Sequence, residues 1–242
     1  MPFAESPRYN AEEEYLMKKL IVICVWISLV SIPVLAGSLT VLGGYTSPRG
    51  DSDIFDQNAL ETDFDVDDLN DFGASFSYDH FIGEFVNVGA GVSFFDGDTR
   101  VTDQEFETID GLPIRRIISL QVVPLEANIR FLPAGREAAV IPYIGGGAGI
   151  YFWEYEERGD FVFDRNTDDP QLVTGTAFSD GADAGWHVEG GVHIPFSRQA
   201  AFVAEGKYWR AEGDLDERGF DPSFEAIDLS GTMFSAGISI WF

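Results

Sequence analysis

The sequence predicts an all-β fold, an eight-stranded antiparallel up-and-down transmembrane β-barrel. Three observations lead to this prediction. Stretches of alternating apolar and polar residues recur along the chain, and the segments that join them alternate between long and short. In several stretches one face is apolar while the other carries glycine and charged residues. Such a face is expected to contact lipid, which places charge inside the barrel.

The N-terminal segment resembles a secretion signal. From Met17 the chain reads MKKLIVICVWISLVSIPVLAGS, with two lysines, an apolar run of 16 residues from Leu20 to Leu35, and small residues suited to cleavage after Ala36. Because a spanning helix needs about 20 apolar residues, we favour a cleaved signal over a retained anchor. We therefore expect residues 1–36 to be an N-terminal extension and signal peptide, and residues 37–242 to form one barrel domain.

The composition limits the classes of partner. The chain has 41 acidic and 15 basic residues, a formal net charge of -26, and 45% hydrophobic residues. So much apolar surface with this charge predicts a folded chain rather than a disordered one. The excess of negative charge would repel phosphates, which argues against nucleic acid as a partner. The single cysteine lies in the predicted signal, so an exported domain would have to be stable without disulfides.

Eight alternating stretches follow residue 36. They are 39–46, 72–80, 85–95, 117–132, 141–155, 183–196, 201–212 and 227–242. The long connections are 47–71, 96–116, 156–182 and 213–226, and the short ones are 81–84, 133–140 and 197–200. Eight strands at this spacing predict a β-sandwich or barrel. Long and short connections on opposite rims are typical of an outer-membrane barrel.

The stretch 183–196 separates apolar from polar side chains most clearly. Its apolar face consists of Ala184, Trp186, Val188, Gly190, Val192, Ile194 and Phe196. The other face carries Gly185, His187, Glu189, Gly191, His193 and Pro195. We expect the first face to meet lipid and the second to line the lumen. In the stretch 141–155, four aromatic side chains share a face and are expected to form interfacial aromatic belts: Tyr143, Tyr151, Trp153 and Tyr155.

The lumen is the first candidate for a functional site. Its predicted lining residues are Glu126, Asn128, Arg130, His187, Glu189, His193, Glu205 and Lys207. If Phe196 pairs with Phe202, His193 lies opposite Glu205 and Gly191 opposite Lys207. Two interpretations remain open. The charges either pair within a packed plug, because eight strands enclose just enough room for side chains, or they line a narrow polar pathway.

A β-bulge is expected in the stretch 117–132. Ile118, Leu120 and Val122 are apolar, whereas Glu126 and Arg130, which fall on the same face by simple alternation, are charged. This reversal suggests that the phase of the strand slips near residues 123 and 124. Residue 124 is a proline, which cannot donate a hydrogen bond to the ladder.

Three segments carry a family resemblance. DFGASFSYDHFIGEFVNVGAGVSFFDGD, VVPLEANIRFLPAGREAAVIPYIGGGAGIYF and WHVEGGVHIPFSRQAAFVAEGKYW resemble small outer-membrane β-barrel domain families, above all the outer-membrane protein W family. The resemblance implies eight strands, location in the outer membrane and a channel for hydrophobic ligands. It also implies a signal for the barrel-assembly machinery at the end of the chain, comprising Phe234, Ile238, Ile240 and Phe242. The long acidic segments depart from that family.

These acidic segments, at 51–56, 63–71 and 214–221, are the second candidate site. They would bind divalent cations, bridge to the phosphates of lipopolysaccharide, or simply form a solvated surface. An EF-hand is not predicted, because Asp68 stands where its loop requires glycine. No metal site or cofactor is predicted. Enzymatic activity is not expected either, because lipid-modifying barrels combine a histidine with a serine, and His187 has no serine two residues away.

The sequence thus predicts an outer-membrane barrel with a structural role or a narrow passage for small solutes. Its expected partners are outer-membrane lipid, lipopolysaccharide and the barrel-assembly machinery. A soluble periplasmic or secreted barrel that binds an apolar ligand is the alternative, and it requires Trp186, Val188 and Val192 to point inward. Recognition or cation binding through the acidic segments is compatible with the same barrel.

Overall fold

A computed structural model describes residues 36–108, 110–165, 167, 169–215, 220, 224 and 226–242. The predicted leader, apart from Ala36, lies outside this part of the chain. Within the described residues, helices are too short or too polar to cross a membrane.

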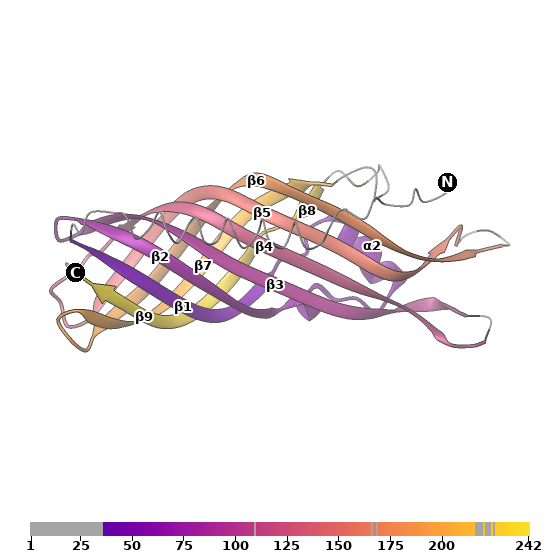
Figure 1. The fold of residues 1–242 in the computed structure, drawn as a ribbon, viewed down its shortest axis with the longest axis horizontal. Coiled ribbons are helices and arrows are strands. Elements are labelled where there is room, and N and C mark those ends of the chain that lie inside the picture. Colours follow the sequence, from indigo (N-terminus) through magenta and orange to yellow (C-terminus); the bar gives the residue numbers. More distant parts are fainter. Residues whose placement is uncertain are drawn as a thin grey trace, which may run out of the picture. The chain divides into compact units, whose positions relative to one another are not determined.

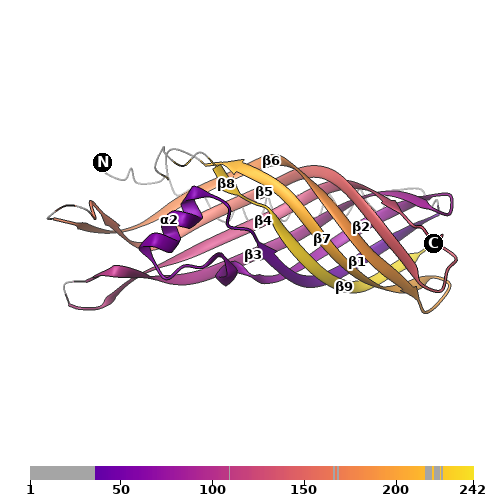
Figure 2. The same cartoon turned by 180° about the vertical axis from the view of Figure 1, so that it is seen from behind.

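Eight antiparallel strands form a closed ring, shown from two sides in Figures 1 and 2. The elements are β1 (Gly37–Pro48), α2 (Asp53–Glu61), the 3-10 helix η1 (Val66–Leu69), β2 (Asp71–Ile82), β3 (Val86–Glu107), β4 (Pro113–Phe131), β5 (Ile141–Phe163), β6 (Gln171–Pro195), β7 (Ala200–Asp214), β8 (Ala226–Asp228) and β9 (Gly231–Trp241). Each strand from β1 to β6 pairs with the next one along the chain, and β9 closes the ring by pairing with both β7 and β1. The short β8 adds to the end of β7. The predicted eight-stranded barrel is confirmed.

An apolar belt surrounds the outside of the ring. The exposed side chains that form it include Val41, Tyr45, Phe72, Phe94, Leu125, Ile129, Ile144, Phe152, Trp186, Val188, Phe202, Phe234 and Ile238. On β5 the outward apolar stretch runs from Pro142 to Phe152, a length of 11 residues. About 9–11 residues are what a tilted strand needs to cross a bilayer. The soluble alternative requires the opposite orientation for Trp186 and Val188.

The belt ends sharply at its upper edge, meaning the edge nearer the long connections. Val123 and Phe152 are cross-strand neighbours within it. One step further along the same faces, Asp96, Gln121 and Glu154 form a polar row across β3, β4 and β5. The outward faces therefore change from lipid-compatible to water-compatible within one pair of residues.

Strands β3 to β6 continue well beyond the belt as two projecting hairpins (Figure 1). Much of the segments 96–116 and 156–182, which the sequence predicted as loops, is strand, and the segment 47–71 contains α2 and η1. In the projecting part the alternation is reversed, because Val101, Ile118 and Tyr155 are buried inside while Asp96 and Glu154 face outward. Surrounded by water, a strand must turn its apolar face inward.

The predicted β-bulge near residue 124 is wrong. β4 pairs with β5 in one continuous register through Pro124, which lies opposite Tyr151. On the β3 side the register is the same before and after this point, with Val92 opposite Leu125 and Phe95 opposite Val122. Ile118 and Glu126 therefore share the interior face. The reversal in the sequence marks a change in what fills the barrel, from charged groups to an apolar cluster.

The predicted pairing of β6 with β7 is shifted by two residues. The turn is tight, because the amide of Phe196 donates to the carbonyl of Ala200 at 3.1 Å. Glu205 consequently lies opposite Gly191, and Lys207 lies opposite Glu189. The rings of Phe196 and Phe202 still contact each other, with centroids 4.6 Å apart, as diagonal neighbours on the outer surface.

The barrel interior as the candidate functional site

A buried ion-pair network centred on Arg130 fills the lower half of the barrel, at the end with the short connections. The guanidinium donates to Asp79 on β2 at 2.6 Å and to both carboxylate oxygens of Glu189 on β6, at 2.5 and 3.1 Å. It also donates to Glu205 on β7 at 3.3 Å. The planar guanidinium group can bond to several carboxylates at once because its five N–H donors point in fixed directions. A single arginine thereby ties together four strands.

Tyr143 supports this network from β5. Its hydroxyl donates to Glu205 at 2.7 Å, and its ring lies 5.2 Å from the Arg130 guanidinium carbon. His193 packs against the same ring, with centroids 4.9 Å apart. Aromatic faces of this kind stabilise a nearby cation.

A second cluster is centred on Glu126 of β4. Its carboxylate accepts a hydrogen bond from the Tyr151 hydroxyl at 2.6 Å and one from the ammonium of Lys207. His187 Nδ1 lies 3.1 Å from Glu126 Oε1, but neither ring nitrogen has a hydrogen-bond partner among the described residues. Among the described residues, four buried carboxylates in these two clusters form ion pairs with only two cations, Arg130 and Lys207.

The structure brings the predicted lumen residues together. Seven of them belong to, or pack against, one of the two clusters: Glu126, Arg130, His187, Glu189, His193, Glu205 and Lys207. Asn128 also points inward, because a Cβ built on Gly89 would meet its side chain. Asp79 was not among the lumen residues predicted from the sequence. The alternation of β2 carried the signal, since Asp79 lies in phase with Ser75 and Ser77 on the inward face.

The predicted aromatic belt on β5 is wrong. Tyr143, Tyr151, Trp153 and Tyr155 do share one face, but that face is the interior, where all four are buried. Their polar atoms bond to interior carboxylates, as in the hydrogen bond from Trp153 Nε1 to Asp183 at 2.7 Å. A tyrosine or tryptophan can fill space and satisfy a buried acid with one side chain.

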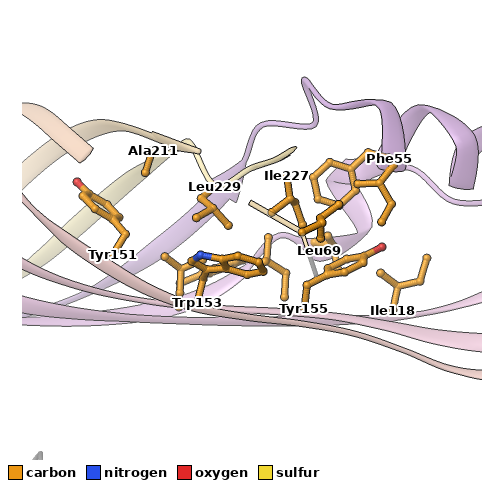
Figure 3. Packing of buried hydrophobic residues seen from close by; sticks show 14 of the residues in the cluster. Phe55, Leu69, Ile118, Tyr151, Trp153, Tyr155, Ala211, Ile227 and Leu229 are labelled. Atoms are coloured by element: carbon orange, nitrogen blue, oxygen red, sulfur yellow. The ribbon is translucent and has the colours of Figure 1, made fainter. Parts of the chain in front are cut away.

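An apolar cluster closes the upper half of the barrel, towards the projecting hairpins (Figure 3). Phe55 and Leu69, from the segment between β1 and β2, enter the barrel and pack with Ile118, Trp153 and Tyr155 of its wall. The helical spacing of α2 explains this entry, because Ile54, Phe55 and Asn58 are buried on one face. The exposed residues of the helix are Asp53, Asp56, Gln57, Ala59 and Leu60. The helix and η1 therefore act as an internal cap.

Asn58 anchors this cap to the wall. Its side-chain amide donates to the hydroxyl of Tyr155 at 2.9 Å and to Glu157 at 2.8 Å, and its oxygen accepts from Arg116 at 2.5 Å. Glu61 at the end of α2 lies 3.5 Å from the same arginine. Buried polar groups of this kind are costly unless paired, so these bonds fix the position of the helix.

A smaller apolar cluster closes the lower end. It consists of Leu42, Leu132, Ile141, Tyr143 and Val203. A cavity of about 10 Å³ beside Lys207 and Val122 has room for at most one water. Within the described residues, no group of three or more histidine, cysteine, aspartate or glutamate side chains is placed to hold a metal ion. Among the described residues, charged and apolar clusters therefore occupy both halves of the interior.

A closed ring of eight strands, an apolar outer belt and a polar interior define a small outer-membrane β-barrel protein. The chain matches no family model and no curated protein. Its fold is similar to the crystal structure of neisserial surface protein A, with a TM-score of 0.51, 11% identity, and coverage of 85% of this chain and 97% of that chain. It is also similar to the outer membrane protein OprG from Pseudomonas aeruginosa, with a TM-score of 0.49, 13% identity, and coverage of 86% and 97%. At such identities the likeness concerns the fold alone.

Proposed function

We propose that this chain is a structural, non-enzymatic protein of the outer membrane whose barrel is closed to solutes. The observation that carries the proposal is that side chains of the described residues occupy both halves of the interior. The network around Arg130 occupies the lower half, and the apolar cluster capped by α2 occupies the upper half.

The arrangement argues against the narrow passage that was the other prediction. A hydrated ion on the barrel axis would have to separate Arg130 from Glu189 and Glu205, which leaves buried charges without partners. It would then have to displace Phe55 and Leu69, which offer no polar group to replace its water. Selective channels instead line their paths with oxygen atoms or rings of charge.

The proposal includes partners. The apolar belt suits outer-membrane lipid, and the charged rows above it would lie at the level of lipopolysaccharide headgroups. Phe234, Ile238 and Ile240 are exposed on the last strand, and Phe242 is exposed directly after it, which is the arrangement that recognition by the barrel-assembly machinery would need. That recognition, membership of the outer-membrane protein W family, and divalent cations at the acidic segments stay predictions.

Planar-bilayer conductance of the refolded chain tests the closed barrel. Folding is verified first by heat-modifiable gel mobility. We expect no current steps from the wild type. Reproducible steps whose ion selectivity changes in Glu205→Gln or Arg130→Gln would contradict the proposal and establish the lumen as a pathway lined by those residues.

A further inference from the structure

An open groove of about 630 Å³ lies where α2 meets the two projecting hairpins. Helix α2 supplies one wall, β3 contributes Glu105, and the β5–β6 connection contributes Arg165. Figure 2 shows α2 beside the projecting parts of β3 to β6. Neither the closed lumen nor the lipid belt accounts for this groove.

The groove has an excess of negative charge. Asp53, Asp56 and Glu105 line it with exposed side chains, and within the described residues no cation lies within ion-pair distance of them. Arg165 is the one basic residue among the described lining residues, and it is already engaged. It pairs with Asp103 and lies 3.4 Å from Glu61. Among the described residues, these three carboxylates therefore have no counter-charge.

The same groove has an apolar component. Leu60 is 80% exposed although it sits on a helix whose other large apolar residues are buried. Phe224 lies on the lining as well, and it packs against the edge of the interior cluster. An exposed leucine at the rim of a groove is available for contact with a ligand.

Arg165 gives an internal example of how a cation fits here. Its guanidinium lies between two carboxylates and 5.3 Å from the centre of the Phe106 ring. Acidic side chains next to apolar surface suit a guanidinium or ammonium on an apolar stem, because the stem covers the surface while the charge pairs.

We propose that this groove binds a short basic, amphipathic peptide segment of a partner protein. Lysine or arginine side chains of the segment would pair with Asp53, Asp56 and Glu105, and an apolar side chain would pack on Leu60 and Phe224. The volume falls within the range of about 300–1,000 Å³ that is usual for ligand pockets, which is enough for the side chains of a short segment. The formal net charge of -26 would steer such a segment towards the protein.

Fluorescence anisotropy of a labelled KLRKL peptide with the refolded full chain in uncharged detergent tests the proposal. We expect saturable binding that weakens at high salt. In the triple variant Asp53→Asn, Asp56→Asn, Glu105→Gln the affinity should fall about tenfold, because three exposed charge pairs are lost together. Leu60→Ser should also weaken binding, by about threefold.

A matched variant separates the groove from net charge alone. Asp96→Asn, Asp98→Asn, Asp180→Asn removes the same number of charges from outward faces of β3 and β6 that are not part of the groove. Its affinity for KLRKL should stay within about twofold of the wild type, since these side chains do not contact the segment. Equal loss in the two triple variants, undiminished binding of a KGRKG peptide, or no saturable binding by the wild type would overturn the proposal.

Discussion

Arg130 and Glu189 lie on strands that are not neighbours, and they meet across Gly145 of the strand between them. Two hydrogen bonds join their side chains, from Nε to Oε1 at 2.5 Å and from Nη2 to Oε2 at 3.1 Å. A Cβ at Gly145 would approach Cγ of Arg130 to 2.8 Å and Oε1 of Glu189 to 3.1 Å. The absence of a side chain on β5 therefore makes room for the ion pair.

Arg130→Met should strongly destabilise the barrel. The substitution removes the common partner of Asp79, Glu189 and Glu205, and the loss of one member of a buried ion pair costs about 3–5 kcal/mol. Urea unfolding of the refolded chain measures the free energy change. Arg158→Met is the control, because that side chain is 62% exposed and its pair with Glu156 should contribute at most about 1 kcal/mol. Similar losses in the two variants would contradict a network that contributes to stability.

Gly145→Ala should destabilise the barrel by about 1–3 kcal/mol, because the added methyl group overpacks the space between Arg130 and Glu189. Gly43→Ala provides the comparison within another strand, since a Cβ there meets nothing within 4 Å. Unfolding free energies of both variants check this. If Gly145→Ala proved as stable as Gly43→Ala, the two side chains would have to meet in another way.

Asn58→Ala should loosen the helical cap while the ring of strands stays folded. The change leaves Arg116 and Glu157 with fewer partners in a buried site, at a cost of about 1–3 kcal/mol. We expect hydrogen exchange of the α2 amides to accelerate about tenfold or more, with the strand amides unchanged. Gln57→Ala, on the exposed face of the same helix, should leave exchange unaltered. Equal exchange rates in the two variants would exclude Asn58 as the anchor.

Val188→Arg tests the position of the lipid belt. Val188 and Leu172 face outward on the same strand with similar exposure, 49% and 46%, but only Val188 lies within the belt. An arginine in the middle of a bilayer costs a transmembrane barrel about 2–4 kcal/mol, whereas the cost falls to about 0–1 kcal/mol near the interface and should be no larger beyond it. Unfolding from lipid vesicles should therefore distinguish Val188→Arg from Leu172→Arg. Equal costs would mean that β6 crosses the membrane elsewhere.

In β6, local alternation predicted which side chains face outward, but not the length of the strand. In β6 the assignment of Trp186 and Val188 to one face and His187 and Glu189 to the other agrees with the structure, because successive side chains of a strand point in opposite directions. The same strand begins at Gln171, twelve positions before the predicted start at residue 183. Its outward positions include Leu172 and Phe178, but Thr174, Thr176 and Asp180 interrupt the continuous apolar face that marks a lipid-facing strand.

The helical cap was beyond the reach of strand patterns. Phe55 and Leu69 belong to an acidic segment that the sequence predicted as a loop, and their burial depends on packing against Ile118 and Tyr155 of distant strands. Likewise, nothing local to Asp79 indicates that it would meet an arginine 51 positions further along the chain.

By itself the sequence determined the eight strands, their up-and-down order and, in strands such as β5 and β6, which residues share a face, because these follow from a two-residue period and from nearby turns. In β4 it did not, because the predicted bulge would have put Ile118 and Glu126 on opposite faces. Only the tertiary structure decided what each face meets. Ile118 and Glu126 lie on the same inward face of β4, yet one packs beneath the cap and the other pairs with Lys207. Alternation reports the side of a sheet on which a residue lies, whereas the surroundings on that side depend on strand register, on height relative to the lipid belt, and on a cap contributed by a segment far away in the chain.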